Sequence, residues 1–197
     1  MIAILDYGSG NLRSAERAFA ITGEEVVVTS DYKTAVEANG LVVPGVGAFA
    51  ACMQGLLAIN GDSIIRERIA QERPVLGICI GMQILFATGT EHGKHSGVGI
   101  WDSEVSLLDA PILPHMGWNT VEPDSSSDLF KGLESESFYF VHSYAAKTAV
   151  GKRQTWTTHG QKFLSSVEDG YVSATQFHPE KSGDAGLTLI KNWVSTL

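Results

Sequence analysis

The chain has 197 residues, of which 44% are hydrophobic and 18% are charged, and its formal net charge is −8. This length suits one α/β domain that needs no disulfide or structural metal, and the negative charge argues against nucleic acid or an anionic membrane surface as the main partner. The chain has two cysteines and no run near the ~18 apolar residues of a membrane span, which predicts a reduced, cytoplasmic protein.

In the first half of the chain, short apolar runs alternate with segments of helical pattern. We predict strands at residues 2–5, 26–29, 41–43 and 74–78, and helices at residues 12–22, 48–57, 63–71 and 80–87. Continuous runs rich in β-branched residues are typical of parallel strands buried on both faces. Their alternation with helices predicts an α/β fold, a doubly wound and mostly parallel central sheet with helices on both faces.

The second half of the chain is richer in strands. We predict them at residues 100–107, 117–122, 138–144, 155–158, 163–168 and 172–176, followed by a closing helix at 185–194. Consecutive strands without intervening helices indicate an antiparallel β appendage to the central sheet. Without an internal repeat or a long linker, residues 1–197 are predicted to form a single domain.

The strongest local signal is the segment Gly77-Ile78-Cys79-Ile80-Gly81, between a predicted strand and a predicted helix. It has the form of a nucleophile elbow with sulfur in place of the serine oxygen. A tight strand-to-helix turn would lift the Cys79 thiol above the sheet, at a helix N-terminus that favours the thiolate. The same turn would aim the N–H of Ile80 at a developing oxyanion. Most free cysteines are small buried hydrophobes, so the segment needs further support.

A second signal is the triplet His178-Pro179-Glu180, which follows the last predicted strand. A cysteine hydrolase needs a histidine to take and return a proton, and a third group to orient the imidazole. His178 and Glu180 supply both types, and the proline between them stiffens the segment. An isolated histidine after a strand would be an ordinary surface residue, but its combination with a cysteine elbow favours catalysis.

A third signal is the turn Pro44-Gly45-Val46-Gly47, directly after the predicted strand 41–43. A glycine-flanked turn at the carboxyl end of a strand can present backbone N–H groups to an anion. This end of an open α/β sheet is also where ligands bind. Taken alone, the turn is better explained as the end of a strand.

Together these signals resemble the class I glutamine amidotransferases, with the glycine turn, the cysteine elbow followed by Gln83, and the His-Pro-Glu triplet in that order. The resemblance implies that Cys79 attacks the side-chain amide of L-glutamine and forms a glutamyl thioester. His178 would protonate the leaving ammonia and then activate water, with Glu180 orienting it. Gln83 would lie in the glutamine pocket. The resemblance implies no cofactor and no metal.

The resemblance also implies which backbone groups stabilise charge. Gly45, Val46 and Gly47 would form the oxyanion hole together with the N–H of Ile80. Because the glycine turn is flexible, we expect the hole to form only when a partner contacts the chain.

Three further segments are similar to one branch of this family, the glutaminase subunits of imidazole glycerol phosphate synthase in histidine biosynthesis. They are residues 6–12, 114–119 and 140–144. In that branch the partner is a (β/α)₈-barrel cyclase, which forms a heterodimer with the glutaminase and uses the ammonia. The resemblance places Asn11, Met116 and Trp118 at the partner interface. It places His142, Ser143 and Tyr144 in the glutamine pocket. Trp118 could otherwise be a core residue, and residues 142–144 an ordinary strand end.

Three other functions share part of this pattern. One is the glutaminase subunit of a different synthase, such as the pyridoxal phosphate or anthranilate system, and residues 115–119 argue against it. Another is a non-catalytic relative that serves only protein interaction, which would have no use for Cys79, His178 and Glu180 together. The last is a cysteine peptidase of similar fold, which Gln83 and the His-Pro-Glu triplet disfavour.

Overall fold

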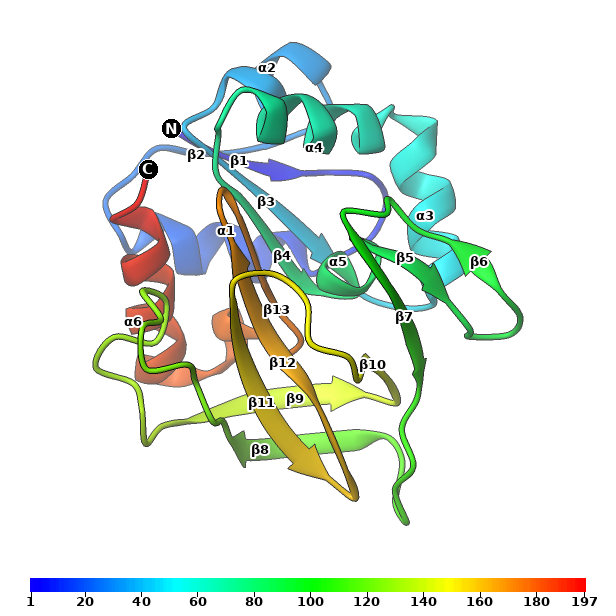
Figure 1. Ribbon diagram of the computed structural model, residues 1–197. Helices are drawn as coiled ribbons and strands as arrows, with labels where there is room; N and C mark the ends of the chain where they lie inside the picture. The colour runs from blue at the N-terminus through cyan, green and yellow to red at the C-terminus, as the bar shows by residue number, and fades with distance from the viewer.

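The apolar runs of the sequence form the middle of a seven-stranded sheet in the computed structural model, which describes residues 1–197 (Figure 1). The strand order is β11-β12-β13-β4-β3-β1-β2. The parallel strands are β1 (Ile2–Leu5), β2 (Val26–Thr29), β3 (Gly40–Gly45), β4 (Val75–Cys79) and β13 (Val172–Thr175). At one edge β11 (Arg153–His159) and β12 (Gln161–Asp169) pair antiparallel. Every residue of β1, β3 and β4 is buried, as expected for strands covered on both faces.

Two groups of helices flank this sheet (Figure 1). One group pairs α1 (Leu12–Ala20) with α6 (Gly183–Val194), where the rings of Phe19 and Trp193 meet edge to face at 5.8 Å. The other consists of α2 (Tyr32–Glu37), α3 (Phe49–Ala58) and α4 (Gly61–Ala70). This arrangement confirms the predicted α/β fold with helices on both faces of a mostly parallel sheet.

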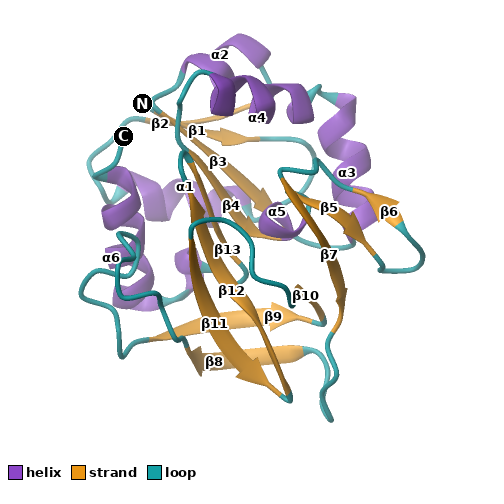
Figure 2. Cartoon of the chain, in the orientation of Figure 1, coloured by secondary structure: helices purple, strands orange, loops and turns teal.

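Two small sheets form the predicted β appendage (Figure 2). A four-stranded sheet has the order β10 (Tyr144–Ala146), β7 (Trp101–Leu107), β5 (Phe86–Gly89) and β6 (His95–Ser96). A two-stranded sheet pairs β8 (His115–Thr120) with β9 (Ser137–His142), antiparallel, so that His115 lies opposite His142. Within these two small sheets, only the pairing of β5 with β7 is parallel.

The structure corrects several predicted boundaries. The helix predicted at 80–87 is the single turn α5 (Ile80–Gln83). It stops because the carbonyl groups of Ile84 and Leu85 accept hydrogen bonds from the distant N–H groups of Val98 and Ile100, both at 2.7 Å. Strand β3 runs two residues beyond the prediction, into the first half of the glycine turn. The elements α2, β5 and β6 were not predicted.

A buried arginine ties α2 to the starts of β3 and β4. The side chain of Arg68 on α4 is fully buried, and its pKa is lowered to about 10 by burial and by the charge of Arg73. No carboxylate pairs with it. Its guanidinium instead donates to backbone carbonyl groups at 2.8–3.1 Å, those of Ala35, Val36, Ala38, Asn39 and Pro74. One cation therefore joins the end of a helix to a neighbouring turn, although Val36 and Ala38 also accept from Arg73 and Pro74 accepts from the N–H of Leu41.

Arg68→Lys is expected to lower the free energy of unfolding by at least about 3 kcal/mol, measured by denaturant titration. A lysine keeps the charge but lacks the planar fork that reaches these carbonyl groups, and unpaired buried groups each cost about 1–3 kcal/mol. Arg13→Lys, at an exposed position of α1, is the matched control and should change the value by less than about 0.5 kcal/mol. Equal effects of the two substitutions would contradict the role of Arg68.

Candidate active site

The elbow predicted around Cys79 is present and depends on close packing. Cys79 ends β4 with φ of 56° and ψ of −112°, and α5 begins at the next residue. A Cβ atom on Gly81 would overlap the carbonyl oxygen of Val43, and one on Gly77 would lie 2.7 Å from the carbonyl oxygen of Gly81. Only glycine allows α5 to approach the two strands this closely. A left-handed conformation is rare and strained for cysteine, and such strain is typical of functional positions.

His178 and Glu180 lie just beyond the end of β13, the strand beside β4. His178 Nδ1 and Glu180 Oε1 are 2.8 Å apart, and both side chains are almost fully buried. The segment is fixed from behind, since the hydroxyl of Ser182 donates to the carbonyl group of His178 and accepts from the N–H of Tyr139. Glu180 is the second residue of the short 3₁₀ helix η1 (Pro179–Lys181). The carboxylate therefore holds the imidazole with Nδ1 as the donor.

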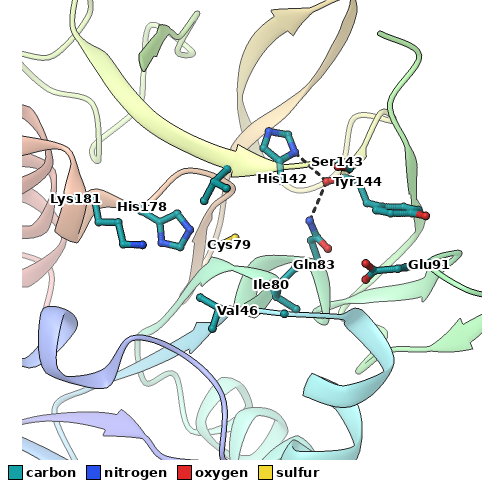
Figure 3. Close-up of a pocket in the computed structure, with 12 residues that line it drawn as sticks. Val46, Cys79, Ile80, Gln83, Glu91, His142, Ser143, Tyr144, His178 and Lys181 are labelled. Atoms are coloured by element: carbon teal, nitrogen blue, oxygen red, sulfur yellow. Dashed lines mark hydrogen bonds between the residues drawn. The ribbon is translucent and has the colours of Figure 1, made fainter. Parts of the chain in front are cut away.

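The imidazole of His178 points toward Cys79 (Figure 3). Its second ring nitrogen, Nε2, is buried and has no hydrogen-bond partner. Burial alone would lower the pKa of His178, but the nearby sulfur of Cys79, the hydrogen bond to Glu180 and the charges of both groups outweigh burial and raise it. The raised pKa favours the protonated imidazole of His178, the acid partner that a cysteine nucleophile requires.

A cavity of about 260 Å³ opens between the elbow and the β9–β10 connection (Figure 3). Most of the predicted site residues line it, namely Val46, Gly47, Cys79, Ile80, Gln83, His142, Ser143, Tyr144 and His178. Gly45 and Glu180 do not line it. The lining residues that the sequence did not suggest are Glu91, Val141 and Lys181. Glu91 follows the unpredicted strand β5, so no local signal marked it, whereas Lys181 directly follows the predicted triplet.

Gln83 lines this cavity and has one buried acceptor without a partner. Its Nε2 donates at 2.9 Å both to the carbonyl group of Tyr144 and to Oε1 of Gln176. Both amide hydrogens are used, while its Oε1 is buried and has no partner. A ligand N–H could therefore satisfy Gln83, and the predicted place of this residue in a substrate pocket stays open to test.

His142 was predicted to contact a ligand in the glutamine pocket, but both of its ring nitrogens contact other groups of the protein. Its ring lies in a buried pair with His115, where His115 Nδ1 and His142 Nε2 are 2.9 Å apart. Burial lowers the pKa of His142 to about 3 and that of His115 to about 4. Both rings are neutral at pH 7. His142 borders the cavity, and its polar atoms are engaged by the protein.

The glycine turn lies beside Cys79 because Gly45 on β3 is paired with Cys79 on β4. The turn is held by the loop after β1. Tyr7 donates from its hydroxyl to the carbonyl group of Pro44 at 2.5 Å, and Ser9 Oγ bonds both the N–H and the carbonyl group of Val46, at 3.0 and 2.8 Å. The N–H of Val46 is thus occupied by Ser9 and is not free to bind an oxyanion.

The predicted interface residues lie at the surface. Met116 and Trp118 point to the same side of β8 and are 61% and 58% exposed, so Trp118 is not a core residue. Trp118 reaches Gly183 just after η1. Asn11 is exposed and caps α1, which contacts η1 from another direction. Trp118 and helix α1 therefore both border the segment that carries His178.

No group of three or more histidine, cysteine, aspartate or glutamate side chains is arranged to hold a metal ion. None of the helices has the length and apolar character needed to span a membrane.

Residues 3–196 match the family described as glutamine amidotransferase class-I. Similar curated proteins include imidazole glycerol phosphate synthase subunit HisH of Mycobacterium bovis, 58% identical, with 100% of this chain and 98% of the relative covered. The HisH subunits of Nocardia farcinica and Thermobifida fusca are 56% and 55% identical, with the same coverage.

Solved structures agree in fold. A crystal structure described as glutamine amidotransferase has a TM-score of 0.75 at 17% identity, covering 98% of both chains. The structure of PurLQS from Thermotoga maritima has a TM-score of 0.71 at 17% identity, covering 99% of this chain and 97% of the other. At these identities the likeness concerns the fold alone.

The neutral pair of His115 and His142 makes stability depend on pH. Because the folded pKa values lie below the ordinary value of about 6.5, the unfolded chain binds more protons as pH falls from 6.5 toward 4, and stability is lost in that window. For His142 the expected slope is about 1.4 kcal/mol per pH unit. Denaturant titrations at several pH values should show that the free energy of unfolding of His142→Asn depends correspondingly less steeply on pH. An unchanged slope would contradict a neutral His142.

Proposed function

The chain belongs to the class I glutamine amidotransferases, and from this premise we propose that Cys79, His178 and Glu180 are its catalytic residues. Its function is that of the glutaminase subunit of imidazole glycerol phosphate synthase, which hydrolyses glutamine for histidine biosynthesis. The observation that carries the proposed roles is the buried His178–Glu180 pair, at 2.8 Å, whose free ring nitrogen points toward the strained cysteine (Figure 3).

The proposed reaction begins with transfer of the Cys79 thiol proton to His178 Nε2. The thiolate attacks the side-chain amide carbon of L-glutamine and forms a tetrahedral intermediate. His178 returns the proton to the amide nitrogen, ammonia leaves, and a glutamyl thioester remains on Cys79. Water, deprotonated by His178, then attacks the thioester and releases glutamate and the free thiol. Glu180 accepts from Nδ1–H throughout, so that Nε2 faces the reacting atoms.

The negative oxygen of the intermediate would be stabilised by the N–H of Ile80 and by the turn Gly45–Gly47. Since Ser9 now occupies the N–H of Val46, we propose that the turn must rotate to complete the oxyanion hole. Two neutral hydrogen bonds contribute only about 1 kcal/mol each, so contact with a partner can displace them. The isolated chain is therefore expected to be a slow glutaminase.

The pocket supports recognition of a free amino acid. Glu91 borders the cavity, with one carboxylate oxygen accepting from the N–H of Phe49 at 2.8 Å and the other available. A carboxylate in this position can bind the α-ammonium group of glutamine. The unpartnered Oε1 of Gln83 is a second acceptor for a substrate N–H, and Ser143 and Tyr144 form the opposite wall.

We propose that the partner is a (β/α)₈-barrel cyclase that binds as a heterodimer over Asn11, Met116 and Trp118. The exposure of Met116 and Trp118 on one side of β8 supports this assignment, because neighbouring large apolar groups at the surface mark interaction sites. Ammonia in water at neutral pH is mostly protonated, so direct transfer between subunits preserves the nucleophile. Two unpaired cysteines support a reducing, cytoplasmic location. Residues 1–197 are proposed to form one domain.

Cys79→Ala should abolish glutamine-dependent synthesis by the complex with the cyclase and leave ammonia-dependent synthesis intact. The substitution removes the sulfur that attacks the amide and leaves the partner's chemistry untouched. Synthesis is measured as product formation with either nitrogen source. Loss of both activities would mean that the substitution damages assembly, and retention of both would exclude Cys79 as the nucleophile.

Ser9→Ala should raise glutamate release by the chain without its partner about fivefold or more. It removes the two hydrogen bonds from Ser9 to Val46, together about 2 kcal/mol, and leaves only the weak bond from the thiol of Cys52 to the Val46 carbonyl group. Ser126→Ala, in the surface turn where Ser126 bonds Asp124, is the matched control and should leave the rate unchanged. An unchanged or lower rate for Ser9→Ala would contradict the holding role of Ser9.

A further inference from the structure

A continuous series of hydrogen bonds connects β8 with the sulfur of Cys79. It begins at Asn119, whose Nδ2 lies 3.1 Å from His115 Nε2, and passes through His142 to the carbonyl group of Tyr144, which is 3.0 Å from His142 Nδ1. The same carbonyl group accepts from Gln83 (Figure 3). From Gln83 the series continues through Gln176 to the nucleophile.

Backbone carbonyl groups fix the direction of every bond in this series. The Tyr144 oxygen can only accept, so His142 must carry its proton on Nδ1, and its Nε2 must accept from His115. His115 Nε2 then accepts from Asn119 Nδ2, which also donates to the carbonyl group of Thr158 at 3.1 Å. Burial keeps both imidazoles neutral, since it lowers the pKa of each well below 6.5. These tautomers therefore leave no alternative pattern of donors.

The same logic fixes the two amides. Gln83 must place its nitrogen toward the Tyr144 oxygen, and its second hydrogen then points at Gln176 Oε1, 2.9 Å away. Gln176 consequently turns its own nitrogen toward Cys79, with Nε2 and Sγ 3.8 Å apart. Gln176 is 1% exposed, and its side chain bonds only these two residues. The fully buried side-chain amide of Gln176 thus donates to the sulfur of Cys79.

We propose that Gln176 is a further catalytic residue that donates a hydrogen bond to the sulfur of Cys79, and that His142 and His115 are positioning residues that hold it in this orientation through Gln83. The inference rests on the proposed function of Cys79 as the nucleophile. A hydrogen bond to the charged sulfur is stronger than one to the neutral thiol, so the amide favours the thiolate. It opposes the burial that would otherwise disfavour this charge.

The direct test is Gln176→Met, which keeps an unbranched side chain of similar length and lacks the amide. The rate of Cys79 alkylation by iodoacetamide is followed against pH, and peptide mass spectrometry separates Cys79 from Cys52. The expected result is a rise of about one unit in the midpoint pH, a tenfold loss of thiolate. In the complex with the cyclase, kcat for glutamate release should fall at least tenfold with KM within threefold. An unchanged alkylation profile would overturn the role of Gln176.

A pair of His142 variants tests the positioning residues and keeps the proposal testable if Gln176→Met does not fold. His142→Asn retains an N–H that can reach the Tyr144 carbonyl group, whereas His142→Phe fills the space without a donor. The alkylation profile should shift in the same direction for His142→Phe, by about threefold in rate at pH 7, and stay within twofold for His142→Asn. Equal profiles for the two variants, with thermal unfolding confirming a folded chain, would overturn the positioning role. Glutamine hydrolysis by Cys79→Ala would instead overturn the proposed function, whatever the alkylation shows.

Discussion

The close contact of α5 with β3 and β4 is the constraint on which the site depends. Gly81 lies so near Val43 that no side chain fits, and this contact holds Cys79 in its left-handed conformation. The same contact brings Gly45 opposite Cys79 in the sheet. A rigid core thereby absorbs the strain of the elbow, which a flexible loop could not do.

The order of three adjacent strands then assembles the chemistry. β4 carries Cys79, the proposed nucleophile, at its carboxyl end, with β3 on one side and β13 on the other. β3 leads into the glycine turn, and β13 leads into His178 and Glu180. Because parallel strands end at the same edge, residues distant in sequence meet there without a dedicated scaffold. The β8–β9 pair borders the same edge and links the nucleophile, through neutral histidines and buried amides, to the strand that exposes Trp118.

The sequence predicted the parallel strands, the elbow and the His-Pro-Glu triplet because each has a local signature. Continuous apolar runs mark buried strands, and glycines on either side of Cys79 mark a tight turn. The short α5 could not be predicted, since its helical pattern is overridden by pairing of residues 84–86 with distant strands. The role of Ser9 and the inward contacts of His142 were also beyond prediction. They depend on side chains from segments that meet only after folding.

The most direct test of the central claim is covalent labelling with a chloroketone analogue of glutamine, which places an electrophile where the substrate carries its amide. One equivalent of label is expected to abolish glutaminase activity of the complex, with Cys79 in the modified peptide and protection by excess glutamine. Loss of activity through a label on another residue, or full activity with Cys79 modified, would exclude Cys79 as the nucleophile.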